Sequence, residues 1–143
     1  MNMDKEKIRV IVICLFRHEG RILVVESLDH AKGDYFAPSL GGGVEFGEHS
    51  RDALIREIRE EVYAEIENIE LLGVIENTFI YEGEQGHEVV FVYDAKFCDG
   101  SLYSKKEIPV YESEIDLRAT ASWYSPETLE AKGTRLVPEG LAI

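Results

Sequence analysis

The sequence predicts an α+β fold, a layered domain with a mixed β-sheet and few helices. Segments rich in β-branched residues alternate with polar turns over most of the chain, a pattern typical of strands. Only the segment 50–62 combines good helix formers with a capping residue and no interior glycine or proline. Because no repeat, low-complexity tract or linker interrupts the 143 residues, we expect a single domain over 1–143.

The expected strands cover residues 8–16, 21–25, 69–79, 89–97 and 119–124. The first two flank the polar turn 18–20 and are predicted to pair as a hairpin. The next two are predicted to form an antiparallel pair joined by a loop at 81–86. Tyr35 to Pro38 adds a short extended piece, because Pro38 disfavours helix in the residue before it.

The segments between these strands are predicted from their turn and cap residues. The polar stretch 27–33 and the glycine run Gly41 to Gly43 are expected to be loops. Ser50 is the predicted N-cap of the main helix. Ser125 and the proline after it indicate a second, short helix over 126–131.

The charge balance limits the partners of the protein. Fifteen basic against 28 acidic side chains give a net charge of −13, which repels nucleic-acid polymers and anionic membranes. A phosphorylated small molecule would need cations as intermediaries. The apolar run 8–16 is too short to cross a bilayer and contains Arg9, so we place the protein in the cytoplasm. A monomer and a homodimer both stay open.

The two cysteines point to packing. Cys14 and Cys98 each lie inside an apolar run, where a free thiol behaves as a small apolar side chain. We expect neither a disulfide framework nor a metal cluster from them.

The main helix carries a cluster of carboxylates. Glu57, Glu60 and Glu61 are spaced i, i+3, i+4, so they fall within an arc of roughly 100° on one helix face. A neighbouring face collects apolar residues, namely Ile55, Ile58, Val62 and Ile66. Like charges at i, i+4 destabilise a helix, so a cation is expected to offset them. The alternative is a merely solvated, glutamate-rich helix in which Arg56 pairs with Glu60.

The glycines before this helix favour a ligand site over a solvated helix. Gly41 to Gly43 and Gly47 bracket a short segment before another acid, Glu48. Glycines let the backbone approach a ligand closely, and clustered carboxylates suit a hard cation such as Mg²⁺. No Gly-Lys-Ser/Thr follows, and no alternating Asp/Asn series precedes a loop glycine, so neither a P-loop nor an EF-hand is indicated.

Gly42, five residues, Glu48, seven residues and then Arg56-Glu57-Ile58-Arg59-Glu60-Glu61 resemble the signature of the Nudix hydrolases. The full signature spans Gly42 to Ala64, and it joins a glycine loop, fixed spacings and four acids. The strand order around it also resembles the mixed β-sheet of that family, which is sandwiched between α-helices.

The resemblance implies a metal-dependent hydrolase. The metal ligands for Mg²⁺, with Mn²⁺ as a substitute, would be the Gly41 carbonyl, Glu48, Glu57, Glu60 and Glu61. The implied catalytic residues are Glu57, Glu60, Glu61 and Arg56, the arginine orienting one of the acids. Family members hydrolyse a nucleoside diphosphate linked to a further group, by attack of water on phosphorus.

The sequence departs from the family signature at the end of the helix. Tyr63 stands where the family has glycine, and Ala64 where a larger aliphatic residue is usual. Tyr63 must either extend the helix or accept left-handed strain of roughly 1 kcal/mol or more. Pro38 also lies farther from the glycine run than the proline of the family does.

Residues outside the signature give weaker indications. Candidates for a general base are Glu112, Glu114 and His87, although a surface role is the stronger expectation for the histidine. Aromatic side chains that would stack on a nucleobase, or more simply pack within the fold, are Tyr35, Phe79 and Tyr81. Trp123 is expected to pack against the short second helix.

The leading hypothesis is Mg²⁺-dependent hydrolysis of a phosphoanhydride bond in a nucleoside di- or triphosphate or a related nucleotide derivative. One alternative is an ADP-ribose or nucleotide-sugar pyrophosphatase. Another is a non-catalytic, nucleotide-sensing Nudix-like domain, which would have no need for a repulsive carboxylate cluster.

Overall fold

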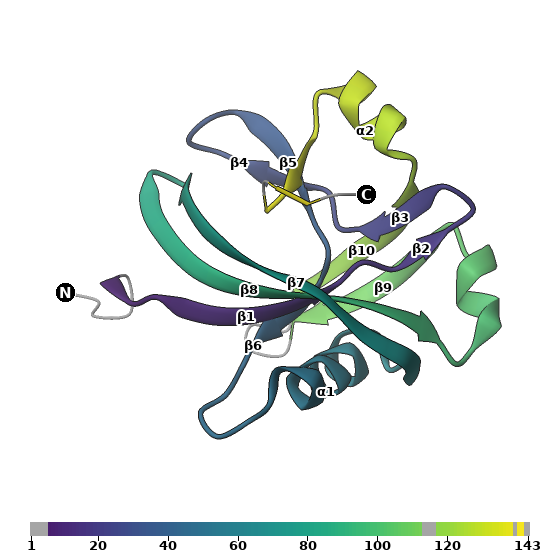
Figure 1. Ribbon diagram of the computed structural model, residues 1–143. Helices are drawn as coiled ribbons and strands as arrows, with labels where there is room; N and C mark the ends of the chain where they lie inside the picture. Colours follow the sequence, from purple (N-terminus) through teal and green to yellow (C-terminus); the bar gives the residue numbers. More distant parts are fainter. Residues whose placement is uncertain (1–5, 113–116, 139, 142–143) are drawn as a thin grey trace.

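The computed structural model describes residues 6–112, 117–138 and 140–141, which form three sheets and two α-helices (Figure 1). The largest sheet has the order β6-β1-β8-β7 and consists of β6 (Leu40–Gly43), β1 (Arg9–Cys14), β8 (Glu84–Phe97) and β7 (Ile66–Tyr81). The second sheet consists of β2 (Arg17–His18), β3 (Arg21–Val24), β10 (Leu117–Tyr124) and β9 (Glu107–Glu112). The third consists of β11 (Arg135–Val137), β5 (Asp34–Pro38) and β4 (Ser27–Asp29).

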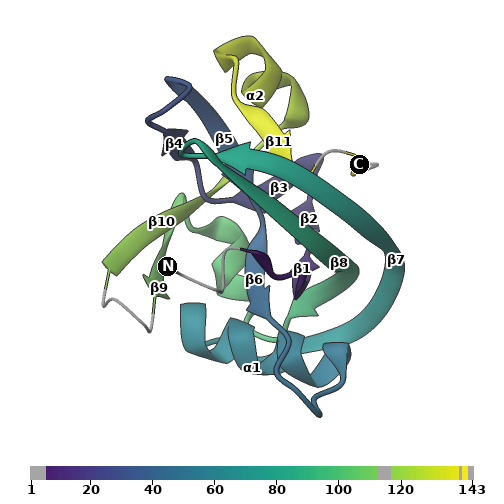
Figure 2. The same cartoon turned by 90° about the vertical axis from the view of Figure 1, so that its left-hand side faces the viewer.

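The helices lie on opposite sides of the sheets, α1 below and α2 above in both views (Figure 1; Figure 2). Helix α1 (Ser50–Val62) buries Leu54 and Ile58 in the main apolar core. Helix α2 (Pro126–Lys132) buries Leu129 in a separate cluster with residues of β3 and β5. The predicted α+β architecture, a mixed sheet between helices, is therefore confirmed.

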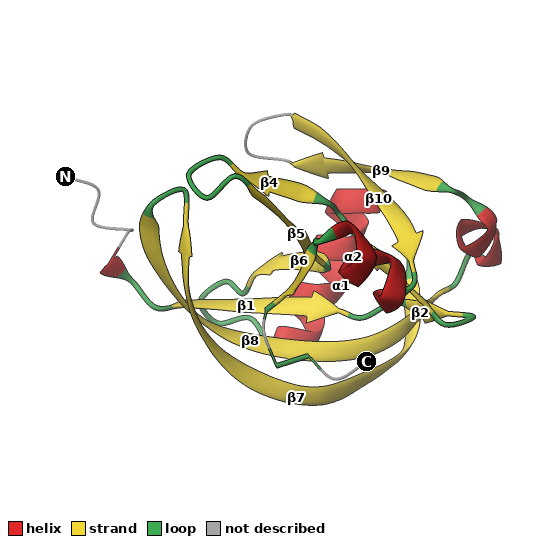
Figure 3. Cartoon of the chain, turned by 90° about the horizontal axis from the view of Figure 1, so that it is seen from above, coloured by secondary structure: helices red, strands yellow, loops and turns green. Residues whose placement is uncertain are grey.

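Strand β1 is an interior strand of the largest sheet. It pairs in parallel with β8 and antiparallel with β6, and Figure 3 shows it between them. The predicted hairpin of 8–16 with 21–25 is confirmed only next to its turn, where the N–H of Leu23 donates to the Phe16 carbonyl; β1 itself ends at Cys14, and the strand that pairs with β3 across this turn is the two-residue β2. The apolar run puts Val12 and Cys14 in one core cluster and Ile13 in another, as in an interior strand that is buried on both faces.

The β7–β8 pair is longer and its turn is tighter than the sequence indicates. The predicted loop 81–86 is wrong: only Glu82 and Gly83 connect the strands, both with positive φ (53° and 78°). Two residues of positive φ match the right-handed twist of the strands that they join. The register shifts twice near the other end of the pair, between Glu67 and Glu70 and between Leu71 and Gly73.

The short strands β4 and β11 and the strand β9 were not among the expected strands. Strand β4 lies within the polar stretch 27–33, which was predicted to be a loop. Each of these strands has its partner in the third or the second sheet, and their pairing is set by the fold rather than by a local pattern.

The predicted main helix is confirmed over Ser50–Val62, but its N-cap is wrong. His49 is the capping residue, with extended backbone angles and no capping bond from its side chain. The hydroxyl group of Ser50 instead lies 2.7 Å from the hydroxyl group of Tyr93 on β8. Of the predicted apolar face, Ile58 and Val62 are buried, whereas Ile66 already begins β7.

No helix in the described part of the chain is long and apolar enough to span a bilayer.

Candidate active site

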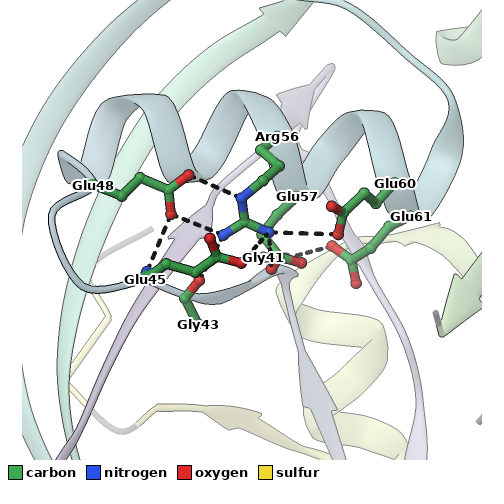
Figure 4. A network of polar contacts seen from close by, with 8 residues as sticks. All are labelled: Gly41, Gly43, Glu45, Glu48, Arg56, Glu57, Glu60 and Glu61. Carbon is green, nitrogen blue, oxygen red and sulfur yellow. Dashed lines mark hydrogen bonds and ion pairs between the residues drawn. The ribbon is translucent and has the colours of Figure 1, made fainter. Parts of the chain in front are cut away.

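The site forms at the free edge of β6, the end strand of the largest sheet. The glycine run is therefore a strand and not the predicted loop. The N–H of Gly41 donates to Oε1 of Glu61 at 2.9 Å, and the carbonyl of Gly43 accepts from Nη2 of Arg56 at 2.9 Å. Side chains of α1 thus take the place that a further strand would occupy on β6 (Figure 4).

Two glycines let α1 and β1 approach β6 this closely. A Cβ atom on Gly42 would lie 2.4 Å from the carboxyl carbon of Glu57. At Gly41, φ is +155° and a Cβ atom would meet the Val12 carbonyl oxygen. The signature glycine Gly42 therefore makes room for a carboxylate, as the close-approach argument from sequence predicts.

Arg56 lies at the centre of the acidic side chains (Figure 4). Its Nε and Nη2 donate to the two carboxylate oxygens of Glu48, each at 2.9 Å. Its Nη1 donates to Glu57 at 2.9 Å and to Glu60 at 3.4 Å. The expected cation that offsets carboxylate repulsion is thus present within the helix itself, and the pairing of Arg56 with Glu60 is one part of a larger network.

The acids in this network differ in electrostatic state. Hydrogen bonds from Arg56 and from the N–H of Glu45 lower the pKa of Glu48 to about 2. Burial raises the pKa of Glu57 despite its bond to Arg56, and the negative charges of Glu60 and Glu48 act in the same direction. Glu48 is therefore a firmly ionised partner of Arg56, whereas Glu57 carries a charge that its surroundings disfavour.

Glu57 and Glu60 also differ in exposure. The Glu57 side chain is 17% exposed and that of Glu60 is 44% exposed. Glu61 accepts a hydrogen bond at the edge of β6, so the three acids of the predicted helix face range from a half-exposed position to the glycine strand.

The donor set suits a hard divalent cation. Its members are carboxylate oxygens and backbone carbonyls, the ligands that Mg²⁺ and Mn²⁺ prefer. Gly42 has no side chain where Glu57 approaches β6, which leaves room for that carboxylate beside the backbone. Within the described residues, no three His, Cys, Asp or Glu side chains are already grouped as metal ligands. Arg56 holds the Glu57 and Glu60 carboxylates in the present arrangement.

Tyr63 ends the helix in the left-handed conformation, with φ 53° and ψ 39°. Its N–H donates to the carbonyl of Arg59, as expected of a helix-ending residue. Of the two alternatives for this position, the helix stops here and the strain is accepted. The ring lies 5.0 Å from that of Tyr111 on β9, a contact that glycine would lack.

Candidates outside the signature lie in several places. His87 pairs with Glu76 across the β7–β8 hairpin at 3.0 Å, as a surface residue would. Glu112 is the last residue of β9, and Glu114 lies outside the described residues. Trp123 donates to the Leu102 carbonyl of a 3₁₀ helix and belongs to the main core, rather than to the cluster that α2 completes.

The three aromatic candidates for base stacking also differ from one another. Tyr81 packs against Phe36 with ring centroids 5.3 Å apart. The ring of Phe79 covers Gly86 on the paired strand, and Tyr35 is 50% exposed.

Sequence reasoning missed two contributors to the network. The Gly43 carbonyl accepts from Arg56, and the N–H of Glu45 donates to Glu48 at 3.1 Å. Both groups belong to the backbone, so the side-chain pattern carries no signal for them beyond their place in the glycine segment.

The fold and the site define a class: an α+β domain in which carboxylates of one helix meet a glycine strand. The sequence model of the NUDIX domain matches residues 5–140, and the chain belongs to this family. The resemblance of Gly42 to Ala64 is thereby confirmed, and the chain is classed as a Nudix-type hydrolase domain.

Relatives and solved structures agree with this class. The chain is 32% identical to an NAD-capped RNA hydrolase NudC of Pseudomonas fluorescens over 118 residues, which cover 82% of this chain and 37% of that protein. It spans a similar share, 36%, of a protein of the same name from Pseudomonas aeruginosa, at 30% identity over 118 residues and 82% of this chain. The chain thus covers little more than a third of the length of these relatives.

Among solved structures, the chain is similar to a MutT NUDIX hydrolase from Burkholderia pseudomallei, with a TM-score of 0.59, 27% identity and 84% of each chain covered. A NUDIX-family hydrolase from Clostridium perfringens gives a TM-score of 0.60 at 17% identity, covering 90% of this chain and 89% of that one. The second likeness concerns the fold alone.

Proposed function

We propose that this domain hydrolyses a phosphoanhydride bond in a nucleoside di- or triphosphate or a related nucleotide derivative, with Mg²⁺ as cofactor and Mn²⁺ as a substitute. The observation that carries the proposal is that Arg56 binds Glu57 and Glu60 beside the glycine strand β6, where Glu61 accepts a hydrogen bond from the N–H of Gly41. Arg56 compensates part of the repulsion in this like-charge cluster, which costs helix stability, and a bound divalent cation would compensate it further.

The residues proposed to hold the metal are the Gly41 carbonyl, Glu48, Glu57, Glu60 and Glu61. A bound divalent cation would lower the pKa of the attacking water and neutralise charge on the phosphates. Arg56 holds three of the acids in one network, so the carboxylates stay close together at the β6 edge. The bidentate bond to Glu48 fixes the plane of the Arg56 guanidinium, which orients its remaining donors toward Glu57 and Glu60.

A dinucleotide of the NAD type is the second candidate substrate. It is favoured by the relatives, whose printed name is NAD-capped RNA hydrolase and which are 30–32% identical to this chain. The net charge of −13 disfavours contact with a long RNA, so we propose the small dinucleotide rather than the capped polymer. ADP-ribose and nucleotide sugars share its pyrophosphate bond and belong to the same test. A cytoplasmic location and the assembly state stay predictions.

The test is a substrate panel with matched variants. Nucleoside triphosphates, diphosphates, NAD, ADP-ribose and nucleotide sugars are incubated with Mg²⁺ or Mn²⁺, and the phosphate-containing products are identified. We expect Glu60→Gln and Glu61→Gln each to lower kcat by about 100-fold or more, because each removes a charged ligand of the cation that would neutralise the anionic transition state. Glu130→Gln, an exposed acid on α2, is the control and should match the wild type.

Two outcomes would count against the proposal. Turnover by Glu60→Gln and Glu61→Gln at the wild-type rate would overturn the metal assignment. A wild-type protein that binds nucleotides but hydrolyses none of the panel would instead favour the non-catalytic, nucleotide-sensing alternative.

A further inference from the structure

An ion pair between β1 and β8 lies near β6 and is separate from the hydrogen bonds of Arg56. Arg9 begins β1 and stands opposite Glu88 of β8 in the register of the sheet. Nη1 of Arg9 is 3.5 Å from Oε2 of Glu88. The Arg9 side chain is 62% exposed, whereas that of Glu88 is only 13% exposed. A largely buried carboxylate therefore anchors an exposed guanidinium.

The buried member of this pair is held from two sides. Burial raises the pKa of Glu88, while the charge of Arg9 and a hydrogen bond with Asn77 act to lower it. Asn77 stands opposite Glu88 on β7, so the three side chains run across neighbouring strands. A carboxylate in such surroundings is costly unless a cation stays beside it, and this ties Arg9 to one position.

Arg9 is adjacent to Gly43, the residue whose carbonyl Arg56 binds. In the register of β1 with β6, Gly43 stands opposite Ile11, two residues from Arg9 and therefore on the same sheet face. A Cβ atom placed on Gly43 would have Nη2 of Arg9 at 3.9 Å. Two guanidinium groups thus approach Gly43, Arg56 from the free edge of β6 and Arg9 from the sheet face.

The two arginines differ in how exposed their side chains are and in how many of their N–H donors already bind acceptors. Arg56 donates to three carboxylates and to the Gly43 carbonyl, and its side chain is 26% exposed. Arg9 is more than twice as exposed, and its planar fork presents five N–H donors. The chain has a net charge of −13, which repels a polyanionic ligand. An exposed guanidinium near the site would attract such a ligand locally.

We infer that Arg9 is a substrate-binding residue that contacts a phosphate group of the nucleotide, and that Glu88 is the residue that positions it. The inference rests on the proposed function, since it concerns the substrate of the same site. Arginine suits this role because its fork binds phosphate oxygens in a bidentate manner, which lysine does not reproduce. An ordinary surface ion pair, by contrast, joins two exposed side chains and contributes little.

The test compares Arg9→Ala and Arg9→Lys with the wild type, on the best substrate of the panel. We expect Arg9→Ala to raise KM by roughly tenfold, the loss of a charge-assisted hydrogen bond, while kcat is retained. Inorganic pyrophosphate should inhibit Arg9→Ala correspondingly more weakly than the wild type. Arg9→Lys should recover only part of the loss. Arg21→Ala, an exposed arginine of β3, is the matched control and should leave KM unchanged.

Two further variants separate binding from folding. The double variant Arg9→Ala with Glu88→Gln leaves no unpaired buried carboxylate, so it should fold like the wild type and still show the raised KM. Glu88→Gln alone should raise KM less than Arg9→Ala does, because it loosens the arginine without removing it.

An active enzyme in which the double variant keeps the wild-type KM and the wild-type inhibition by pyrophosphate would overturn the role of Arg9. A fall in kcat with unchanged KM would overturn it as well, since a residue that binds substrate acts on KM. An unchanged KM in Glu88→Gln would overturn the positioning role of Glu88. A wild-type protein without turnover is a separate result, which counts against the proposed function itself.

Discussion

Two regions of the molecule contain partly or fully buried carboxylates. The hydrogen-bond donors come from one arginine side chain in the first region and from backbone N–H groups in the second. At the β6 edge, several acids share one guanidinium, and Glu57 has a raised pKa. In the β4–β5 hairpin, Asp29 is 1% exposed and accepts hydrogen bonds from the N–H groups of Ala31, Lys32 and Glu82. Burial acts to raise the pKa of Asp29, but these N–H groups outweigh it and lower the pKa.

The difference separates a carboxylate that builds the fold from carboxylates that we propose as metal ligands. Asp29 is held by backbone donors of its own turn and of the β7–β8 turn, so it joins the tips of two hairpins. The acids of α1 repel one another and depend on a side chain for compensation. Changes at the first place should cost stability, and changes at the second should cost activity.

The largest effect is expected from Gly42→Ala. The new methyl group would lie 2.4 Å from the Glu57 carboxyl carbon, and the flexible end of that side chain would have to move. A displacement of about 1 Å in a catalytic group lowers kcat by about 100-fold. The fold should change little, because the displaced atoms end a side chain. Steady-state kinetics and the thermal midpoint Tm measure the two effects, and a variant with wild-type kcat would contradict the assigned role of this glycine.

A smaller effect, on stability alone, is expected from Asp29→Ala. The substitution removes the carboxylate that accepts hydrogen bonds from N–H groups of both turns. We therefore expect Tm to fall by about 5 °C or more, while kcat of the folded enzyme is unchanged. Asp34→Ala, which removes an exposed acid of the same hairpin, is the control and should cost less.

The pH dependence of the same variant has a definite sign. The folded-state pKa of Asp29 lies below the ordinary value of about 3.9. Its contribution to stability is therefore complete above that pH and is lost as pH falls through the folded-state pKa. The difference in Tm between wild type and Asp29→Ala should shrink in acid. A difference that grows in acid would mean that Asp29 is not the ionised acceptor.

The smallest effect is expected from Tyr63→Gly. Glycine removes left-handed strain but also loses the ring contact with Tyr111 and frees the unfolded chain. These contributions oppose one another, so the free energy of unfolding should change by less than about 1 kcal/mol. Urea denaturation measures it. A large loss of stability would show that the aromatic contact, rather than the helix end, is what matters at this position.

The parts of the molecule that the sequence predicts are those with a local pattern. The i, i+3, i+4 spacing placed Glu57, Glu60 and Glu61 on one face of a helix whose limits are confirmed. The family signature added Gly42 and Arg56, which meet these acids in space.

The parts that it does not predict depend on register between distant segments. Nothing near β1 in sequence indicates that β8 lies beside it, so the approach of Arg9 to Glu88 and Gly43 is invisible until the strands pair. The buried state of Asp29 likewise requires the turn at Glu82, which lies far along the chain. The glycine run was expected to be a loop, because glycine is rare in strands unless another backbone or side chain comes close.

The covered edge of β6 has a consequence for solubility. A strand of small residues with unpaired N–H and carbonyl groups is a template onto which another chain can add. Here Glu61 and Arg56 bind those groups and place charge at the edge, so the same side chains proposed to serve the reaction also oppose self-association of the sheet. Substituting Glu61 and Arg56 would therefore leave backbone groups of β6 unpaired and favour aggregation, in addition to disabling the proposed site.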